Sequence, residues 1–180
     1  MPKNLPNYLT IIRLIFIPII FYFIFTEHYI IAFTFFSISS LTDIADGFIA
    51  RKYNLITDWG KLMDPLADKL TQISTLSALS IRHIIPFWIL IVVTVKEMSM
   101  ICGAFFLYKN EIVTVNSKWY GKFATVILYI AIVLSLLSIK FNILSNFSIY
   151  LYYFALFMTV FAGIMYAKKF LIGNTSLEKN

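Results

Sequence analysis

Apolar residues along the chain form long runs that are separated by short polar segments. Each run is close to the ~20 residues that an α-helix needs to cross ~30 Å of hydrocarbon. No alternation of apolar and polar residues suggests a strand, and the connections are too short to hold a soluble domain. The pattern predicts one all-α membrane domain over residues 1–180, with six transmembrane helices at Leu9–Phe25, Tyr29–Arg51, Gly60–Ser80, Pro86–Tyr108, Trp119–Ile139 and Phe147–Phe170.

The composition agrees with a membrane protein. The chain is 60% hydrophobic and 13% charged, whereas soluble domains are about 45–50% apolar and about 25% charged. A net charge of +6 can indicate nucleic-acid binding, but no basic soluble segment is available to carry that function. The single cysteine, Cys102, excludes an intrachain disulfide and a cysteine-based metal cluster.

Basic residues between the predicted helices indicate the orientation of the chain. If both termini lie in the cytoplasm, the outer loops hold only Arg82 and Lys140. The inner segments then hold Lys3, Arg51, Lys52, Lys61, Lys109, Lys118, Lys122, Lys168, Lys169 and Lys179. Cytoplasmic loops of membrane proteins carry such an excess of Lys and Arg. We therefore expect a multi-pass protein of the plasma membrane with cytoplasmic termini.

Four aspartates lie in or beside the apolar runs, where an ionised carboxylate costs at least a few kcal/mol and usually marks a functional site. Asp43 and Asp46 are three residues apart near the end of the second predicted helix, and Asp64 and Asp68 are four apart at the start of the third. Each spacing places two carboxylates on one helix face. Because the linker between these helices is short, the two faces are expected to meet on the cytoplasmic side.

Carboxylate oxygens without nearby His or Cys are the ligands of Mg²⁺ or Mn²⁺, and Ca²⁺ fits less well. Four of them can hold two ions about 3.5–4 Å apart, as in two-metal phosphoryl transfer. A purely structural role would need cationic partners. The cations expected at this depth, Arg51, Lys61 and Lys69, are too few to pair every carboxylate and also hold a substrate.

Small and cationic residues beside the aspartates suit a phosphate ester. Gly47, Ala50 and Gly60 leave a shallow surface that a nucleotide can approach, and the Arg51 guanidinium can fork onto phosphate oxygens. Thr57 in the linker can contact polar parts of a nucleotide. Two alternatives stay open: the small residues can serve helix packing alone, and Arg51 can be a charge that sets topology.

These positions together read D-x-x-D-G-x-x-A-R-x8-G-x3-D-x3-D and resemble the signature of the CDP-alcohol phosphotransferases. The stretches that begin at Leu5 and Gly60 are similar to the phosphatidylglycerophosphate synthases of that family, and also to its cardiolipin synthases. The resemblance implies displacement of CMP from CDP-diacylglycerol by an alcohol. Asp68 would be the general base, the four aspartates would hold two divalent ions, and the CDP group would contact Gly47, Arg51 and Thr57, with Asn7 and Thr10 closing the pocket.

Two alcohol acceptors fit this interpretation. Glycerol 3-phosphate is favoured, with Arg13, Lys61, Lys96 and Lys122 as candidate ligands of its phosphate; phosphatidylglycerol, giving cardiolipin, is the alternative. Lys96 and Glu97 can instead form a buried pair that stabilises helix packing. A small ion transporter is the rival from another class, because acids within a membrane also mark ion pathways. The resemblance further implies a homodimer.

Overall fold

The computed structural model describes residues 5–53, 58–109, 119–141 and 145–177, and the side chains within 8–48, 52–53, 63–99, 121–139, 147–163 and 165. This part of the chain forms six helices and no strands. The helices are α1 (Leu5–Phe25), α2 (Tyr29–Lys52), α3 (Asp58–Ile81), α4 (Phe87–Lys109), α5 (Trp119–Phe141) and α6 (Ser145–Leu177).

The predicted fold class and all six predicted helices are confirmed. The largest differences from the predicted bounds are at two ends: α1 begins at Leu5 instead of Leu9, and α6 continues past Phe170 to Leu177. Pro6 fits the first turn of α1 because the backbone N–H groups there have no partner within a helix. Within the described residues, Tyr8–Phe25, Tyr29–Phe48 and Gly121–Ile139 are long and apolar enough to cross a membrane, and Phe147–Gly163 is a shorter apolar segment. The chain is an integral membrane protein.

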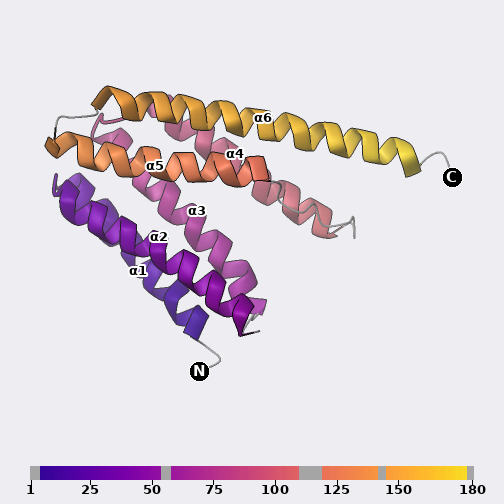
Figure 1. Ribbon diagram of the computed structural model, residues 1–180, viewed down its shortest axis with the longest axis horizontal. Helices are drawn as coiled ribbons and strands as arrows, with labels where there is room; N and C mark the ends of the chain where they lie inside the picture. The colour runs from indigo at the N-terminus through magenta and orange to yellow at the C-terminus, as the bar shows by residue number, and fades with distance from the viewer. Residues whose placement is uncertain (1–4, 54–57, 110–118, 142–144, 178–180) are drawn as a thin grey trace.

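α1, α2 and α3 form a first group of packed helices, and α5 and α6 form a second (Figure 1). α1 packs against both α2 and α3, and α5 packs along α6. α2 and α3 contact α5, whereas α4 contacts α3 and α6. Two helices of the first group, α2 and α3, therefore connect α1 to the rest of the molecule, and α5 lies beside both of them.

Two tight turns of the same kind link α1 to α2 and α3 to α4. The second residue after each helix is non-glycine in the left-handed region, with φ of 64° at Glu27 and 55° at His83. The Ile84 N–H donates to the Leu79 carbonyl over 2.9 Å, as in a Schellman motif, and His28 repeats this bond at the other turn. An ion pair between Arg82 and Glu27 shows that the two turns lie side by side.

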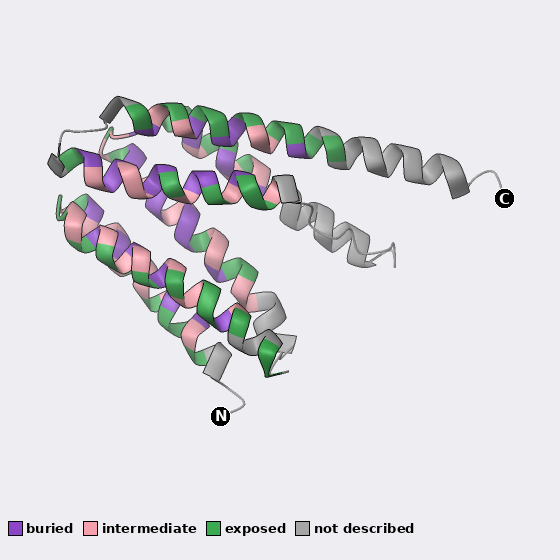
Figure 2. Cartoon of the chain, in the orientation of Figure 1, coloured by how far each residue is buried: buried purple, intermediate pink, exposed green. Residues whose placement is uncertain are grey.

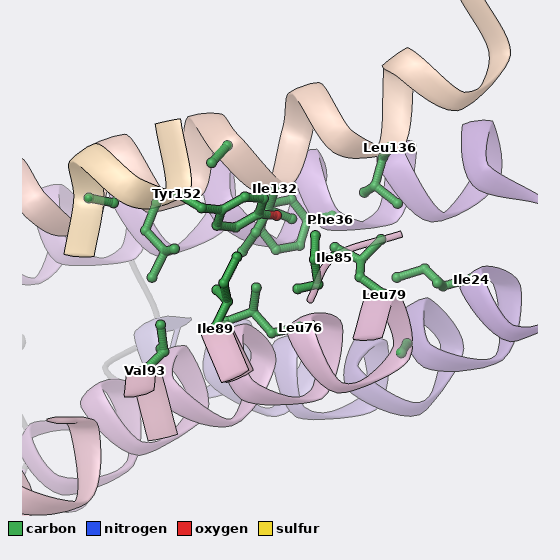
Figure 3. Close-up of a cluster of buried hydrophobic side chains, with 14 of the residues drawn as sticks. Ile24, Phe36, Leu76, Leu79, Ile85, Ile89, Val93, Ile132, Leu136 and Tyr152 are labelled. Carbon is green, nitrogen blue, oxygen red and sulfur yellow. The ribbon is translucent and has the colours of Figure 1, made fainter. Parts of the chain in front are cut away.

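Residues from all six helices form the hydrophobic core. Figure 3 shows Ile24 of α1, Phe36 of α2, Leu76 and Leu79 of α3, Ile89 of α4, Ile132 of α5 and Tyr152 of α6 converging in it. The outward faces of the helices carry exposed large apolar side chains, including Ile15, Ile44 and Phe157 (Figure 2). In a membrane protein such faces meet lipid. Whether a side chain is buried inside the bundle therefore depends on which helix face it occupies more than on whether it is apolar.

Candidate active site

The start of α1, the end of α2 and the start of α3 lie together at one end of the molecule, away from the turn that links α1 to α2 (Figure 1). This arrangement brings the two predicted acidic pairs next to polar residues of α1. Asp43 also interacts electrostatically with Asp64 and Asp68 of α3. The predicted convergence of the two acidic helix faces is therefore present.

Arg13 of α1 pairs with both aspartates of α2. Its Nη1 lies 2.7 Å from Asp43 Oδ1, and its Nη2 lies 2.5 Å from Asp46 Oδ2. Arg13 and Asp46 are buried, whereas Asp43 is partly exposed. The Arg13 Nε is buried without a hydrogen-bond partner among the described residues. A planar guanidinium suits this bridge because its donors diverge in one plane toward two acceptors.

The aspartates of α3 have different partners. The Thr10 hydroxyl of α1 donates a hydrogen bond to Asp64 Oδ1. The Tyr129 hydroxyl of α5 donates to Asp68 Oδ1, and Lys69 Nζ lies 3.0 Å from Asp68 Oδ2. Each acidic side chain of the motif thus has a polar partner, and none of the four partners is a motif residue.

A second group of charges continues from Lys69 into α4. Glu97 is fully buried, and its Oε1 accepts a hydrogen bond of 2.5 Å from Lys96 Nζ. Its Oε2 lies 3.5 Å from Lys69 Nζ. The pairing of Lys96 with Glu97 that the sequence left open is therefore present, and Lys69 joins it to Asp68.

The remaining predicted site residues are less fully described. Gly47 lies half-buried on α2 beside Asp46, and Lys122 is exposed at the start of α5. Thr57 lies outside the described residues, and Asn7, Ala50, Arg51, Gly60 and Lys61 lie in helices at positions whose side chains are not among those described.

The sequence argument about cations lacks one partner. Arg13 pairs two of the aspartates and Lys69 pairs a third, whereas Asp64 contacts the neutral Thr10 hydroxyl. The sequence predicts Arg13 only as a ligand of the acceptor phosphate. Tyr129 was missed altogether. A polar aromatic residue inside an apolar run was its only signal, and α5 holds no other motif residue.

The donor set suits a hard divalent cation, since it consists of carboxylate oxygens from two facing helices. As the side chains stand, however, no three acidic, His or Cys residues of the described part lie close enough together to hold one ion. Arg13, Thr10, Tyr129 and Lys69 contact the carboxylate oxygens instead. A metal ion would need some of these partners to move.

Comparison with known proteins identifies the family. The chain matches the CDP-alcohol phosphatidyltransferase family over residues 3–164. It belongs to that family. The match covers all four aspartates and extends beyond the segments whose sequence carried the resemblance. The ion-transporter alternative is therefore not supported.

Several relatives of this CDP-alcohol phosphatidyltransferase have curated names. The CDP-diacylglycerol--glycerol-3-phosphate 3-phosphatidyltransferase of Aquifex aeolicus is 40% identical over 139 residues, which is 76% of this chain and 75% of that protein. The Rickettsia typhi protein of the same name is 49% identical over 71 residues, 38% of this chain and 40% of that protein. A cardiolipin synthase (CMP-forming) of Streptomyces coelicolor is 35% identical over 102 residues, 57% of this chain and 47% of that protein.

Proposed function

We propose that this enzyme transfers the phosphatidyl group from CDP-diacylglycerol to glycerol 3-phosphate, which gives phosphatidylglycerophosphate and CMP and serves phospholipid biosynthesis. The observation that carries the proposal is the convergence of Asp43 with Asp64 and Asp68 in a chain of this family. The names of the relatives from Aquifex aeolicus and Rickettsia typhi favour glycerol 3-phosphate as the acceptor.

In the proposed reaction, the acceptor hydroxyl attacks the phosphorus atom that carries diacylglycerol. A new P–O bond forms, the P–O bond to the CMP phosphate breaks, and the hydroxyl proton passes to Asp68. A carboxylate can take this proton when it lies within hydrogen-bond reach of the hydroxyl. Two Mg²⁺ or Mn²⁺ ions held by Asp43, Asp46, Asp64 and Asp68 would neutralise charge on the diphosphate.

We assign the donor nucleotide to the surface beside the aspartates of α2 and α3. Gly47, Ala50 and Gly60 would allow close approach, Arg51 would bind phosphate oxygens, and Thr57 would contact the nucleotide. Asn7 and Thr10 would close the pocket from α1. Thr10 supports this assignment because its hydroxyl already contacts Asp64, which places the α1 side chains beside the acidic site.

For the acceptor phosphate, Lys96 is the candidate that the geometry supports best. Its ammonium group pairs with the fully buried Glu97. Glu97 also contacts Lys69, which pairs with Asp68. Arg13 instead pairs with both aspartates of α2. Lys61 and Lys122 remain candidates on sequence grounds alone.

We further propose that the acidic site opens to the cytoplasm, that both termini lie there, and that the enzyme is a homodimer in the plasma membrane. The excess of Lys and Arg at the motif end supports the orientation. The homodimer rests on analogy with the family.

Synthesis of cardiolipin from phosphatidylglycerol is the second candidate function, because the Streptomyces coelicolor relative has that name. The two acceptors differ in charge: glycerol 3-phosphate carries a phosphate monoester, and phosphatidylglycerol carries a diester with a single charge. A site with fewer free cations would therefore suit the lipid.

One assay tests both candidates. The purified enzyme is incubated with radiolabelled CDP-diacylglycerol, Mg²⁺ or Mn²⁺, and either glycerol 3-phosphate or phosphatidylglycerol. CMP release and thin-layer chromatography of the lipid products are then measured. We expect labelled phosphatidylglycerophosphate; labelled cardiolipin in its place would favour the second function, and no CMP with either acceptor would refute both.

A further inference from the structure

Tyr129 is the one side chain of α5 that contacts the aspartates of the motif within the described residues. Its hydroxyl donates a hydrogen bond to Asp68 Oδ1. Its ring packs against Phe36 of α2, with a distance of 5.4 Å between ring centroids. The ring is thus fixed between α2 and α5 while the hydroxyl reaches α3.

The two oxygens of Asp68 have different partners. Tyr129 holds Oδ1 from α5, and Lys69 holds Oδ2 from the next position along α3. Lys69 in turn contacts the buried Glu97 of α4. The carboxylate plane of Asp68 is therefore set by Tyr129 of α5 and by Lys69, which is itself paired with α4, and not by its own side-chain torsions alone.

A tyrosine that serves only packing needs just one hydrogen-bond partner for its buried hydroxyl, and a neutral group is sufficient. Tyr152 on α6 is such a case, since its hydroxyl accepts a hydrogen bond of 3.2 Å from the Ser135 hydroxyl. Tyr129 instead donates to the carboxylate proposed to be the general base. A hydrogen bond to an ionised acceptor is roughly twice as strong as a neutral one and fixes the acceptor more firmly.

We propose that Tyr129 is a positioning residue that orients the Asp68 carboxylate toward the acceptor hydroxyl. The inference rests on the proposed function. With Oδ1 held by the phenol, the proton from the acceptor is taken by the other oxygen, whose direction follows from the first. Loss of the phenol hydroxyl leaves only the Lys69 ion pair to orient the Asp68 carboxylate, and a misplacement on the order of 1 Å can cost about 100-fold in rate.

The first test compares Tyr129→Phe with Tyr152→Phe in the transfer assay. Both changes remove one hydroxyl and keep the ring, so Tyr129→Phe retains the packing of this ring on Phe36. We expect Tyr129→Phe to lower kcat about 10- to 100-fold while the KM values for donor and acceptor stay within about threefold. Tyr152→Phe should keep kcat within about twofold. Equal losses in the two variants, or a loss that appears in KM alone, would overturn the proposal.

The second test needs no turnover. Mn²⁺ binding is measured by electron paramagnetic resonance for the wild type, Tyr129→Phe, Asp68→Asn and the double variant. If Tyr129 acts through Asp68, Tyr129→Phe changes the Mn²⁺ affinity about three- to tenfold when Asp68 is present. It then has no further effect in the Asp68→Asn background. Additive effects would refute the proposal. A wild type that releases no CMP would refute the proposed function, whereas these four affinities would still decide the role of Tyr129.

Discussion

At the scale of single residues, the described part of the acidic site has more negative than positive charge. Asp43 and Asp46 contact Arg13, and Asp68 contacts Lys69, which is shared with Glu97. Thr10 and Tyr129 contribute only neutral hydroxyls. Among the described side chains the carboxylates outnumber the cations, which is the condition under which divalent ions bind well.

The Arg13 bridge leads to a prediction about stability. Arg13→Ala should leave Asp46 buried without its cation, and removal of one partner of a buried pair costs about 3–5 kcal/mol. Mn²⁺ should restore much of this loss by replacing the missing charge. The midpoint of thermal denaturation in detergent, measured with EDTA and with Mn²⁺, checks both statements.

Arg82→Ala is the matched control, because Arg82 pairs with the exposed Glu27 far from the acidic site. Exposed pairs contribute about 0–1 kcal/mol, so its midpoint should change little and should respond to Mn²⁺ as the wild type does. If the two variants behave alike in EDTA, Arg13 has no special role at the carboxylates.

A second residue-scale prediction concerns the acceptor. Lys96→Ala should raise the KM for glycerol 3-phosphate about tenfold or more while the KM for CDP-diacylglycerol stays nearly constant, because a phosphate monoester loses a charge-assisted bond. Lys52→Ala is the control: this exposed lysine, which lies over the Phe48 and Tyr53 rings, should not change either constant. Equal rises in both KM values would indicate that Lys96 serves structure through Glu97.

The sequence could predict the motif residues but not their partners. Asp43 to Asp68 were found because their spacing is local and repeats with the helical turn. Arg13 and Tyr129 contact these aspartates across 33 and 61 residues of sequence. Such contacts depend on which helix faces which, and hydropathy alone does not determine that.

At the scale of elements, the helix bounds followed closely from the sequence because they depend on local features. Apolar runs long enough to cross a bilayer must be helical, since backbone groups in lipid need partners within the segment. The extension of α1 to Leu5 was missed because residues 5–8 carry no apolar periodicity. The turn conformations were missed as well, since neither Glu27 nor His83 is a glycine.

His83 gives a prediction at this scale. It is exposed at φ 55°, a conformation that costs a residue with a Cβ atom about 1 kcal/mol. His83→Gly should therefore raise the midpoint of thermal denaturation, with a net gain of roughly 0.5 kcal/mol after the greater freedom of glycine in the unfolded chain is counted. An unchanged or lower midpoint would contradict this account. Glu27→Gly is a useful comparison, because it relieves the same strain but loses the contact with Arg82.

At the scale of the whole molecule, the packing explains how polar residues are tolerated. Apolar side chains from every helix form the core, while other apolar side chains face outward (Figures 2 and 3). The buried ionisable residues Arg13, Asp46 and Glu97 face partners on neighbouring helices or in the same helix. The pairing of helices could not be predicted from hydropathy, because lipid-facing and protein-facing apolar residues look alike in sequence.

The last prediction concerns the orientation of the molecule. The linked turns at Glu27 and His83 lie at the end of the bundle away from the aspartates, so one end should face outward and the other the cytoplasm. Cys102 is the single cysteine, and a Cys102→Ala background allows labelling at chosen sites. A membrane-impermeant maleimide should label His83→Cys in intact cells and Lys52→Cys only in inverted vesicles, because both positions are exposed at opposite ends. The reverse pattern would place the aspartates on the outer side, where the proposed orientation could not hold.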